Sequence, residues 1–370
     1  MKIAIVMPRY TSFGPARATS IDLCVRDFVA HSRHRAQTRI ICDPVEVPFA
    51  GFNLEPAPAA GPGGHLLKAW RAAAQIRRSP VDLVVVQQHL PTAFVIARRL
   101  KTPVLFHSHN YQKRSANPAR RALRAWRYKS LDGMMLVSQS CVDRFERDWP
   151  GVALQRAVVH NGLDMQSWTP APVRRNQIFI AGRAAPEKGI LEAMRAVAEV
   201  LPGAPGWTAQ FMLSEGARHK DYFGQIAAIA ARFPGRIDIL ENQPHSAVKA
   251  AYETAAIALV LSRWNEPFGR TALEAQAGGA ALISSGSGGL REISGATALM
   301  VDPDNHAAVV DALSSLTSDD DLRHRLGREG RDRVAALFDI HVVSSWLDDI
   351  YESIARDGKM PERPSTPGPR

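Results

Sequence analysis

The chain has 370 residues, of which 45% are hydrophobic and 22% are charged, and these proportions are ordinary for a soluble globular protein. At about 150 residues per domain, this length predicts two domains that each bury a core of their own. The composition excludes a wholly disordered or collagen-like chain, and three scattered cysteines (Cys24, Cys42 and Cys141) are too few for a disulfide framework or a zinc cluster. We therefore expect a cytoplasmic protein with no signal peptide and no membrane span.

The net charge of +10 is distributed unevenly along the chain. Residues 1–170 contain 24 Lys and Arg against 11 Asp and Glu, whereas the remaining residues contain 22 basic and 25 acidic side chains. This asymmetry predicts that one domain meets an anionic partner. Phosphate-bearing substrates, anionic lipid headgroups and nucleic acid all fit the charge.

Residues 1–165 alternate short apolar runs with helical patterns. The alternation predicts a parallel sheet with helices on both faces, and therefore a first doubly wound α/β domain. The runs that predict strands are 2–7, 38–42, 81–86, 103–106 and 133–137, and the helical patterns are 19–31 and 92–100.

The same pattern starts again after residues 160–172, which contain Asn-Gly and two prolines, and it predicts a second α/β domain at 166–338. The expected strands are 177–181, 209–213, 237–240, 257–261 and 281–284, and the expected helices are 190–200, 222–232, 246–254 and 270–278. A last helix, 339–356, carries Trp346, Ile350 and Tyr351 at helical spacing, and the proline-rich residues 357–370 predict a disordered tail. Because ligands bind at the carboxyl ends of strands in open α/β sheets, we expect the site in a cleft between the two domains.

The strongest chemical signal is the segment 261–279, in which a strand leads through Pro267 into a helix. Backbone N–H groups at such a helix N-terminus suit a phosphate or diphosphate. Here they belong to Phe268, Gly269, Arg270 and Thr271. The carboxylates of Glu266 and Glu274 suit the hydroxyl groups of an extended polyhydroxylated ligand. The plainer interpretation is that Glu266 favours the helix dipole and that Glu274 lies on a solvated face.

Two further segments follow strands. Arg183 and Lys188 stand in a strand-to-helix loop, where two cations are suited to neutralise a leaving diphosphate, although a solvated turn is the alternative. Residues 284–292 are rich in Ser and Gly, so their open backbone fits either a nucleotide phosphate or a tight turn.

Together these segments resemble the retaining glycosyltransferases of family 4, also called glycosyl transferases group 1. The resemblance rests on Glu266-x7-Glu274 around Glu-Pro-Phe-Gly, on Gly182-Arg183 with Lys188-Gly189, and on Gly288-Gly289-x-x-Glu292. Asn161-Gly-Leu-Asp164 is similar to the Asn-Gly-Val-Asp that opens the second domain of these enzymes. The resemblance implies the GT-B fold, with two facing Rossmann-like domains, an interdomain cleft, and a final helix that crosses back onto the first domain.

The resemblance also implies roles for single residues. Arg183 and Lys188 would bind the donor diphosphate, Glu266 would hold hydroxyls of the transferred sugar with help from the backbone of residues 268–270, and Glu274 would bind the nucleotide ribose. His109 resembles a histidine that faces the donor sugar, with a purely structural histidine as the alternative and His107 as its near neighbour.

One departure from the family concerns the loop after the first strand, where a Gly-Gly pair usually donates an N–H to the donor phosphate. This chain has Phe13-Gly14-Pro15-Ala16 instead, and proline carries no N–H. Gly14 or Ala16 is therefore the candidate for this contact.

The implied activity is a retaining, metal-independent transfer that needs no cofactor, because the nucleotide sugar is a substrate. We expect a UDP-sugar donor, with a GDP-sugar as the alternative, and a carbohydrate or lipid-linked acceptor, as in polysaccharide or lipopolysaccharide assembly. A sugar-phosphate epimerase or phosphorylase of the same fold is a second alternative. The acidic run 319–321 resembles a metal-binding run, but we interpret it as the first turn of a helix.

Residues 113–129 contain seven Lys and Arg and no acid, interleaved with apolar residues, and Trp70 extends this pattern. The segment predicts a peripheral contact with an anionic membrane surface or a phosphorylated acceptor, and a solvated helix face is the alternative. A nucleic-acid-binding protein would also use such a surface, but no signature of that class is present and we expect no nucleic acid. The residues of this candidate patch are Lys113, Arg114, Arg120, Arg121, Arg124, Trp126 and Arg127.

Overall fold

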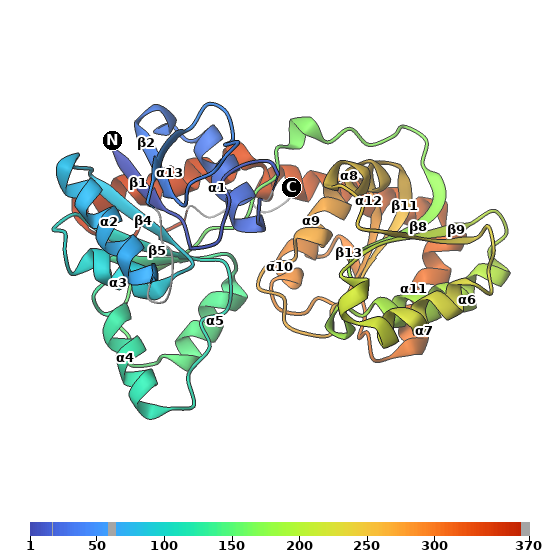
Figure 1. Cartoon of the computed structure of the whole chain (residues 1–370). Coiled ribbons are helices and arrows are strands. Elements are labelled where there is room, and N and C mark those ends of the chain that lie inside the picture. The colour runs from blue at the N-terminus through green and yellow to red at the C-terminus, as the bar shows by residue number, and fades with distance from the viewer. Residues whose placement is uncertain (17, 58–63, 364–370) are drawn as a thin grey trace. The chain divides into compact units, whose positions relative to one another are not determined.

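The structure, a computed structural model, describes residues 1–16, 18–57 and 64–363. The chain divides into two compact units (Figure 1), which are unit 1 (Met1–Gly162 with Ile340–Arg370) and unit 2 (Leu163–Asp339). These boundaries lie close to those that the sequence predicts.

Unit 1 is built on a seven-stranded sheet with the order β3-β2-β1-β4-β5-β6-β7, in which every pairing is parallel. The five strands that the sequence predicts are confirmed. β3 and β7 were not predicted, because neither forms a continuous apolar run. The strands are β1 (Ile3–Val6), β2 (Thr38–Cys42), β3 (Asn53–Pro56), β4 (Leu83–Gln87), β5 (Val104–Ser108), β6 (Gly133–Leu136) and β7 (Arg156–Val158).

A local signal in the sequence explains where the first helix of unit 1 begins. Thr19 caps the first helix through a capping box, in which its hydroxyl accepts from Asp22 N and the Asp22 carboxylate accepts from Thr19 N. The helices are α1 (Ser20–His31), α2 (Gly64–Arg78), α3 (Leu90–Ala97), α4 (Pro118–Tyr128), α5 (Gln139–Asp148) and α13 (Ile340–Asp357).

Helix α13 belongs to unit 1 although it is the last helix of the chain. It packs against α1 and adds Ile340, Trp346 and Ile350 to the apolar core of the unit. The Trp346 Nε1–H donates to Val158 O at 2.9 Å. After α13, Gln155 Oε1 accepts from Met360 N at 2.7 Å. Residues 358–363, which we expected to be disordered, thus run against unit 1, and residues 364–370 lie outside the described residues.

Unit 2 repeats this architecture with a six-stranded parallel sheet of order β10-β9-β8-β11-β12-β13. All five predicted strands and all four predicted helices are confirmed. Its strands are β8 (Arg175–Arg183), β9 (Thr208–Ser214), β10 (Ile237–Glu241), β11 (Ala255–Val260), β12 (Ala281–Ser284) and β13 (Ala298–Met300). Its helices are α6 (Ile190–Val200), α7 (Lys220–Ala230), α8 (His245–Thr254), α9 (Arg270–Ala277), α10 (Leu290–Ser294), α11 (His306–Ser318) and α12 (Asp320–Phe338).

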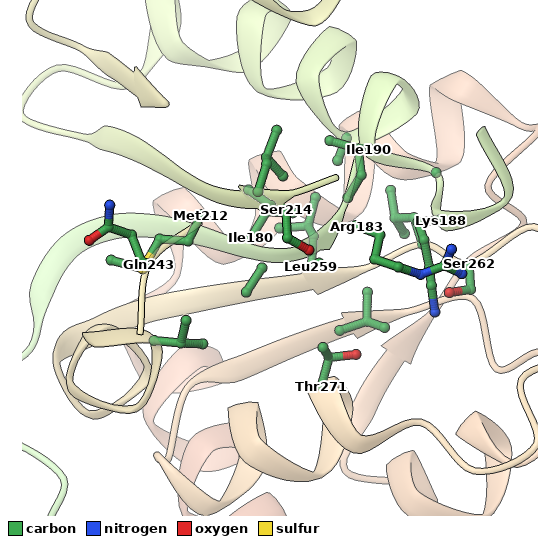
Figure 2. Close-up of a pocket in the computed structure, with 18 of the residues that line it drawn as sticks. Ile180, Arg183, Lys188, Ile190, Met212, Ser214, Gln243, Leu259, Ser262 and Thr271 are labelled. Atoms are coloured by element: carbon green, nitrogen blue, oxygen red, sulfur yellow. The ribbon is translucent and has the colours of Figure 1, made fainter. Parts of the chain in front are cut away.

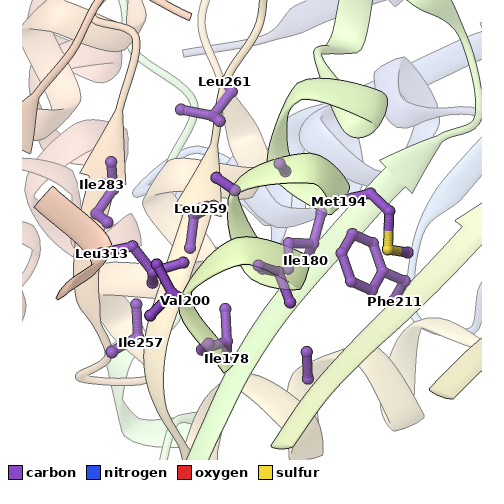
Figure 3. Packing of buried hydrophobic residues seen from close by; sticks show 14 of the residues in the cluster. Ile178, Ile180, Met194, Val200, Phe211, Ile257, Leu259, Leu261, Ile283 and Leu313 are labelled. Carbon is purple, nitrogen blue, oxygen red and sulfur yellow. The ribbon is translucent and has the colours of Figure 1, made fainter. Parts of the chain in front are cut away.

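The core of unit 2 explains why its strands are apolar. Ile178 and Ile257 from two central strands face Val200 of α6 and Leu313 of α11, and all four side chains are buried (Figure 3). Because helices cover both faces of a parallel sheet, its strands are apolar runs rather than alternating patterns.

Two further features bear on the sequence-based expectations. The Asp319 carboxylate accepts from Leu322 N at 2.8 Å and caps α12, so this acidic run opens a helix, as interpreted above. Among the helices that the structure describes, none is both long and apolar enough to cross a membrane.

Candidate functional site

Unit 2 contains a cavity of about 370 Å³ at the carboxyl ends of β8, β9 and β11. The strand order of the sheet reverses between β8 and β11, and this switch point is where ligands bind in open α/β sheets. Arg183, Lys188 and Ser262 lie at one end of the cavity and Met212 and Gln243 at the other (Figure 2). Its other lining residues include Ile180, Gly182, Gly189, Ser214, His245, Val248, Leu259 and Thr271.

The loop that carries the two cations passes unusually close to the end of β11. Gly189 has φ of 65°, and a Cβ atom built there would lie 1.9 Å from Leu261 O. Glycine is therefore required at this position, both for the left-handed backbone and for the close approach. The approach brings Lys188 to the loop after β11.

We expect Gly189→Ala to destabilise unit 2 by about 2 kcal/mol or more, since the left-handed backbone alone costs an alanine about 1–2 kcal/mol. The contact with Leu261 O adds to this cost. The melting temperature measures the effect, and Gly203→Ala is the matched control, because a Cβ atom there meets open space. Equal melting temperatures for the two variants would contradict the requirement.

Lys188 and Glu266 form an ion pair at the cationic end of the cavity. Lys188 Nζ lies 2.6 Å from Glu266 Oε1, and Ser262 Oγ donates to the same oxygen at 2.6 Å. Glu266 is only 7% exposed. The lysine ammonium also lies 5.6 Å from the centre of the Trp264 ring. A carboxylate and a cation that the sequence separates by 78 positions thus meet at one point.

The Ser- and Gly-rich segment 284–292 braces this carboxylate loop. Glu266 forms a parallel β-bridge with Gly288, and Glu266 O accepts from Gly289 N at 2.8 Å. Ser287 Oγ donates to Ser262 O and to Trp264 O at 3.0 and 2.8 Å. These contacts support the tight-turn interpretation of the segment.

Glu274 lies on α9, is 4% exposed, and faces two basic groups. Its Oε1 accepts from Arg270 Nε at 2.7 Å and contacts His245 Nε2 at 2.9 Å. Burial alone would raise the pKa of Glu274, but the hydrogen bond from His245 and the charge of Arg270 outweigh it and hold the pKa below its ordinary value. Glu274 is therefore a buried carboxylate and does not lie on a solvated face.

The remaining predicted residues of unit 2 divide between the cavity and the packing around it. Thr271 and Arg183 line the cavity, and Arg183 pairs with Glu187 at 3.0 Å. Phe268 is buried, and its ring packs on Phe338 with centroids 6.2 Å apart. At Gly269, φ is 113° and a Cβ atom would lie 2.3 Å from Leu290, so packing requires this glycine.

Sequence reasoning missed four polar residues that line the cavity, Ser214, Gln243, His245 and Ser262. Each lies at the end of a strand, or in or directly after the loop that follows one, at β9, β10 or β11. That position was the available signal, because polar residues after neighbouring parallel strands converge at one edge of the sheet.

His109 of unit 1 lies just after β5 and is held by two glutamines. Its Nε2 lies 2.8 Å from Gln87 Oε1, and its backbone N–H donates to Gln88 Oε1 at 2.7 Å. Burial lowers the pKa of His109 to about 4, so the imidazole is neutral at pH 7. The adjacent His107 is fully buried, and within the described residues neither ring nitrogen has a hydrogen-bond partner. Of these two histidines, His109 is the one whose ring has a described polar contact.

We expect folding stability to fall as the pH falls from 6.5 to about 4, in part because of His109. In this window the unfolded chain binds a proton at His109 and the folded chain does not. His109→Gln should therefore show a shallower loss of melting temperature over this pH range than the natural protein. If the melting temperatures of His109→Gln and of the natural protein fall equally over this pH range, the His109 ring is not buried in its neutral form.

In unit 1, Gly14 is held in local packing and Arg124 is turned inward. The Gly14 N–H donates to Ser12 O at 2.7 Å, and a Cβ atom at Gly14 would lie 2.1 Å from Val47 O, so local packing accounts for this glycine. Its role in donor binding stays a prediction. In the basic segment, Arg124 turns inward and donates to Lys113 O at 2.9 Å, so it is a structural residue rather than part of an open patch.

Comparison with known proteins matches both halves of the chain. Residues 27–167 match the model described as Glycosyltransferase Family 4, and residues 166–333 match the model described as Glycosyl transferases group 1. The chain is 30% identical over 253 residues to glycogen synthase of Mycobacterium tuberculosis. This match covers 65% of this chain and 59% of the length of that protein. It is 24% identical over 318 residues to the lipopolysaccharide core biosynthesis mannosyltransferase LpcC of Rhizobium leguminosarum. This match covers 80% of this chain and 84% of that protein.

Among solved structures, Anabaena HepE in complex with UDP and glucose superimposes with a TM-score of 0.75 at 16% identity, covering 95% of this chain and 100% of that chain. This likeness shows the fold, which is GT-B. The two family matches adjoin and together run from residue 27 to residue 333. The chain therefore belongs to glycosyltransferase family 4.

Proposed function

We propose that the protein is a retaining glycosyltransferase that uses a nucleotide-sugar donor. The observation that carries this proposal is the cavity of unit 2, which has cations at one end and apolar and amide side chains at the other. Such a pocket suits a ligand that is anionic at one end and planar at the other, as a nucleoside diphosphate is.

The cationic end is the place for the diphosphate. Arg183 and Lys188 supply two positive charges, and the N-terminus of α9 begins beside Thr271. The two buried carboxylates, Glu266 and Glu274, are assigned to different parts of the donor. Glu266 stands beside Lys188 and is assigned to hydroxyls of the transferred sugar, and Glu274 stands beside His245 and is assigned to the ribose.

The reaction follows from these assignments. The bond between the anomeric carbon and the diphosphate oxygen breaks, and the acceptor oxygen bonds to the same face of that carbon. The acceptor hydroxyl gives its proton to an oxygen of the departing diphosphate. Lys188, Arg183 and the α9 N-terminus stabilise the negative charge that develops there. Because these groups are cationic already, we propose a transfer that depends on no metal and no cofactor.

UDP is the proposed nucleotide, since the structure of HepE contains UDP and glucose and shares this fold. The proposed acceptor is a carbohydrate or a lipid-linked sugar. The name of LpcC places that relative in lipopolysaccharide core biosynthesis, and this chain covers 84% of it.

Thermal stabilisation by UDP, GDP, ADP and dTDP, each with and without magnesium, tests the proposal. A ligand that binds only the folded state adds about 2.7 kcal/mol of stability at a hundredfold excess over its dissociation constant. We expect UDP to raise the melting temperature without magnesium, and Lys188→Ala to abolish the rise. If only GDP raises the melting temperature, the donor is a GDP-sugar and not a UDP-sugar. If no nucleotide raises it, the assignment of the donor site is wrong.

A further inference from the structure

Helices α2, α3 and α4 lie side by side on unit 1, with α3 packed against both of the others (Figure 1). Their outward side has an unusual composition, which the donor site does not use. We call it the α2–α4 face and define it by Leu66, Leu67, Trp70 and Arg71 of α2 and by Arg120, Leu123 and Trp126 of α4.

Large apolar side chains gather on this face. Leu66, Leu67 and Trp70 are 45%, 42% and 50% exposed, and they follow one another at helical spacing on the outer side of α2. Leu123 and Trp126 of α4 are 42% and 51% exposed. Of the eleven large hydrophobic side chains that are exposed in the described chain, these two helices carry five. Such gathering marks an interaction surface, whereas scattered single residues do not.

Both tryptophans are held in place by α3 or by the residues just after it. The Arg99 guanidinium lies over the Trp70 ring, 2.9 Å from its centre. The Trp126 ring packs on Phe94 of α3, with centroids 4.4 Å apart. The two indoles thus flank α3 as fixed, half-exposed rings, and little rotamer entropy remains to be lost when a partner covers them.

The charge around these rings has one sign. Residues 64–131 contain fourteen Lys and Arg and a single acid, Asp82. Of the basic residues, Arg71, Arg77, Arg120 and Lys129 are exposed on α2 and at α4. Lys68 is an exception, because it is 1% exposed and pairs with Asp43 at 2.9 Å, so Trp70 and not Lys68 joins the patch.

From this combination we infer that the α2–α4 face docks on an anionic lipid bilayer. Tryptophan and leucine enter the boundary between headgroups and acyl chains, and the surrounding Arg and Lys meet the lipid phosphates. A nucleic acid would complement the positive charge of this face, but it would leave the exposed leucines of both helices without an apolar partner. The inference deepens the proposed function by presenting unit 1 to a lipid-linked acceptor, and it rests on surface residues that the donor cavity does not include.

Vesicle sedimentation of the full chain tests the inference. We expect binding to vesicles that mix phosphatidylcholine with phosphatidylglycerol, weak binding to pure phosphatidylcholine, and a loss of binding at high salt. Since each basic residue near such a surface contributes about fivefold, Arg71→Glu with Arg120→Glu should weaken partitioning at least ~25-fold. Arg232→Glu with Arg328→Glu, on unit 2, makes the same change in net charge and should retain most of the binding.

Two further experiments distinguish insertion of the apolar side chains into the bilayer from purely electrostatic binding to its surface. Trp70 and Trp126 should shift their fluorescence to the blue on anionic vesicles, and Trp70→Phe with Trp126→Phe should remove that shift. Leu66→Ser with Leu67→Ser should weaken vesicle binding without changing UDP binding. If Leu66→Ser with Leu67→Ser has no effect and duplex DNA binds as well as vesicles do, the face is a nucleic-acid surface and the inference fails. If UDP binding fails while vesicle binding stays, the donor proposal fails alone.

Discussion

Lys188→Ala should lower the rate of UDP release from the proposed UDP-sugar donor by about 10²–10³-fold, the usual cost of removing one preorganised group from a developing negative charge. The ammonium stands 2.6 Å from Glu266 Oε1 and lines the cationic end of the cavity. Its loss would remove the charge that faces the leaving diphosphate in the proposed reaction, and it would also leave Glu266 without the cation of this ion pair. Steady-state kinetics, with circular dichroism to verify folding, measure the effect.

Arg263→Ala is the matched control for this variant. Arg263 lies in the same loop as Trp264, pairs with Glu192 and Asp304 at 3.3 and 2.8 Å, and does not line the donor cavity. Arg263→Ala deletes one positive charge close to the site, as Lys188→Ala does. Because Arg263 does not line the cavity, the rate of this variant should stay near that of the natural protein. Similar losses in both variants would show that net charge and not position matters, and Lys188 would lose its assigned role.

Glu274→Gln should reduce UDP affinity about 10-fold or more, because a hydrogen bond between a charged group and a hydroxyl, as proposed here for the ribose, contributes about 1.5–3 kcal/mol. The glutamine keeps the shape of the side chain but leaves Arg270 and His245 without their shared carboxylate. Folding should suffer less than the ~3–5 kcal/mol typical of a broken buried pair, since both basic partners reach solvent. Calorimetric titration with UDP and thermal melting give the two quantities.

Glu253→Gln separates affinity from stability in this comparison. Glu253 of α8 accepts from Lys249 Nζ at 2.5 Å and from Thr169 N at 2.6 Å, away from the cavity. Its loss should lower the melting temperature while UDP affinity stays unchanged. If Glu274→Gln also loses only stability, the buried carboxylate is a packing element and the ribose assignment is wrong.

The sequence predicts the sheets well because the apolar run that marks a buried parallel strand is a local feature of the sequence. A strand buried on both faces must be an apolar run, as 81–86 and 257–261 are, and the printed sequence displays such runs directly. β3 escaped prediction because its residues Asn53–Pro56 are half exposed at the sheet edge and carry mixed polarity. Edge strands lack the burial that makes the pattern visible.

The site was predictable where a motif is continuous and not where it depends on contacts between distant segments. Glu266 and Glu274 lie in one stretch of sequence, but His245 reaches Glu274 from another helix. Likewise, a list of basic residues places Arg124 in a surface patch, whereas the fold turns it toward Tyr128 OH and Gln112 Oε1, at 3.3 and 3.1 Å. Which arginine points inward is decided by neighbours that only the folded chain brings together.

The two-segment construction of unit 1 sets the order in which the protein can mature on the ribosome. Unit 2 is one continuous stretch, Leu163–Asp339, so all of it has been synthesised before any of α13 emerges. Unit 1 must wait, because Trp346, Ile350 and Ile354 of α13 complete its core. Nascent chains usually fold from the N-terminus onward, domain by domain. Here the later unit is the first that can be completed, and the earlier one stays open to chaperones or premature contacts until the last helix arrives.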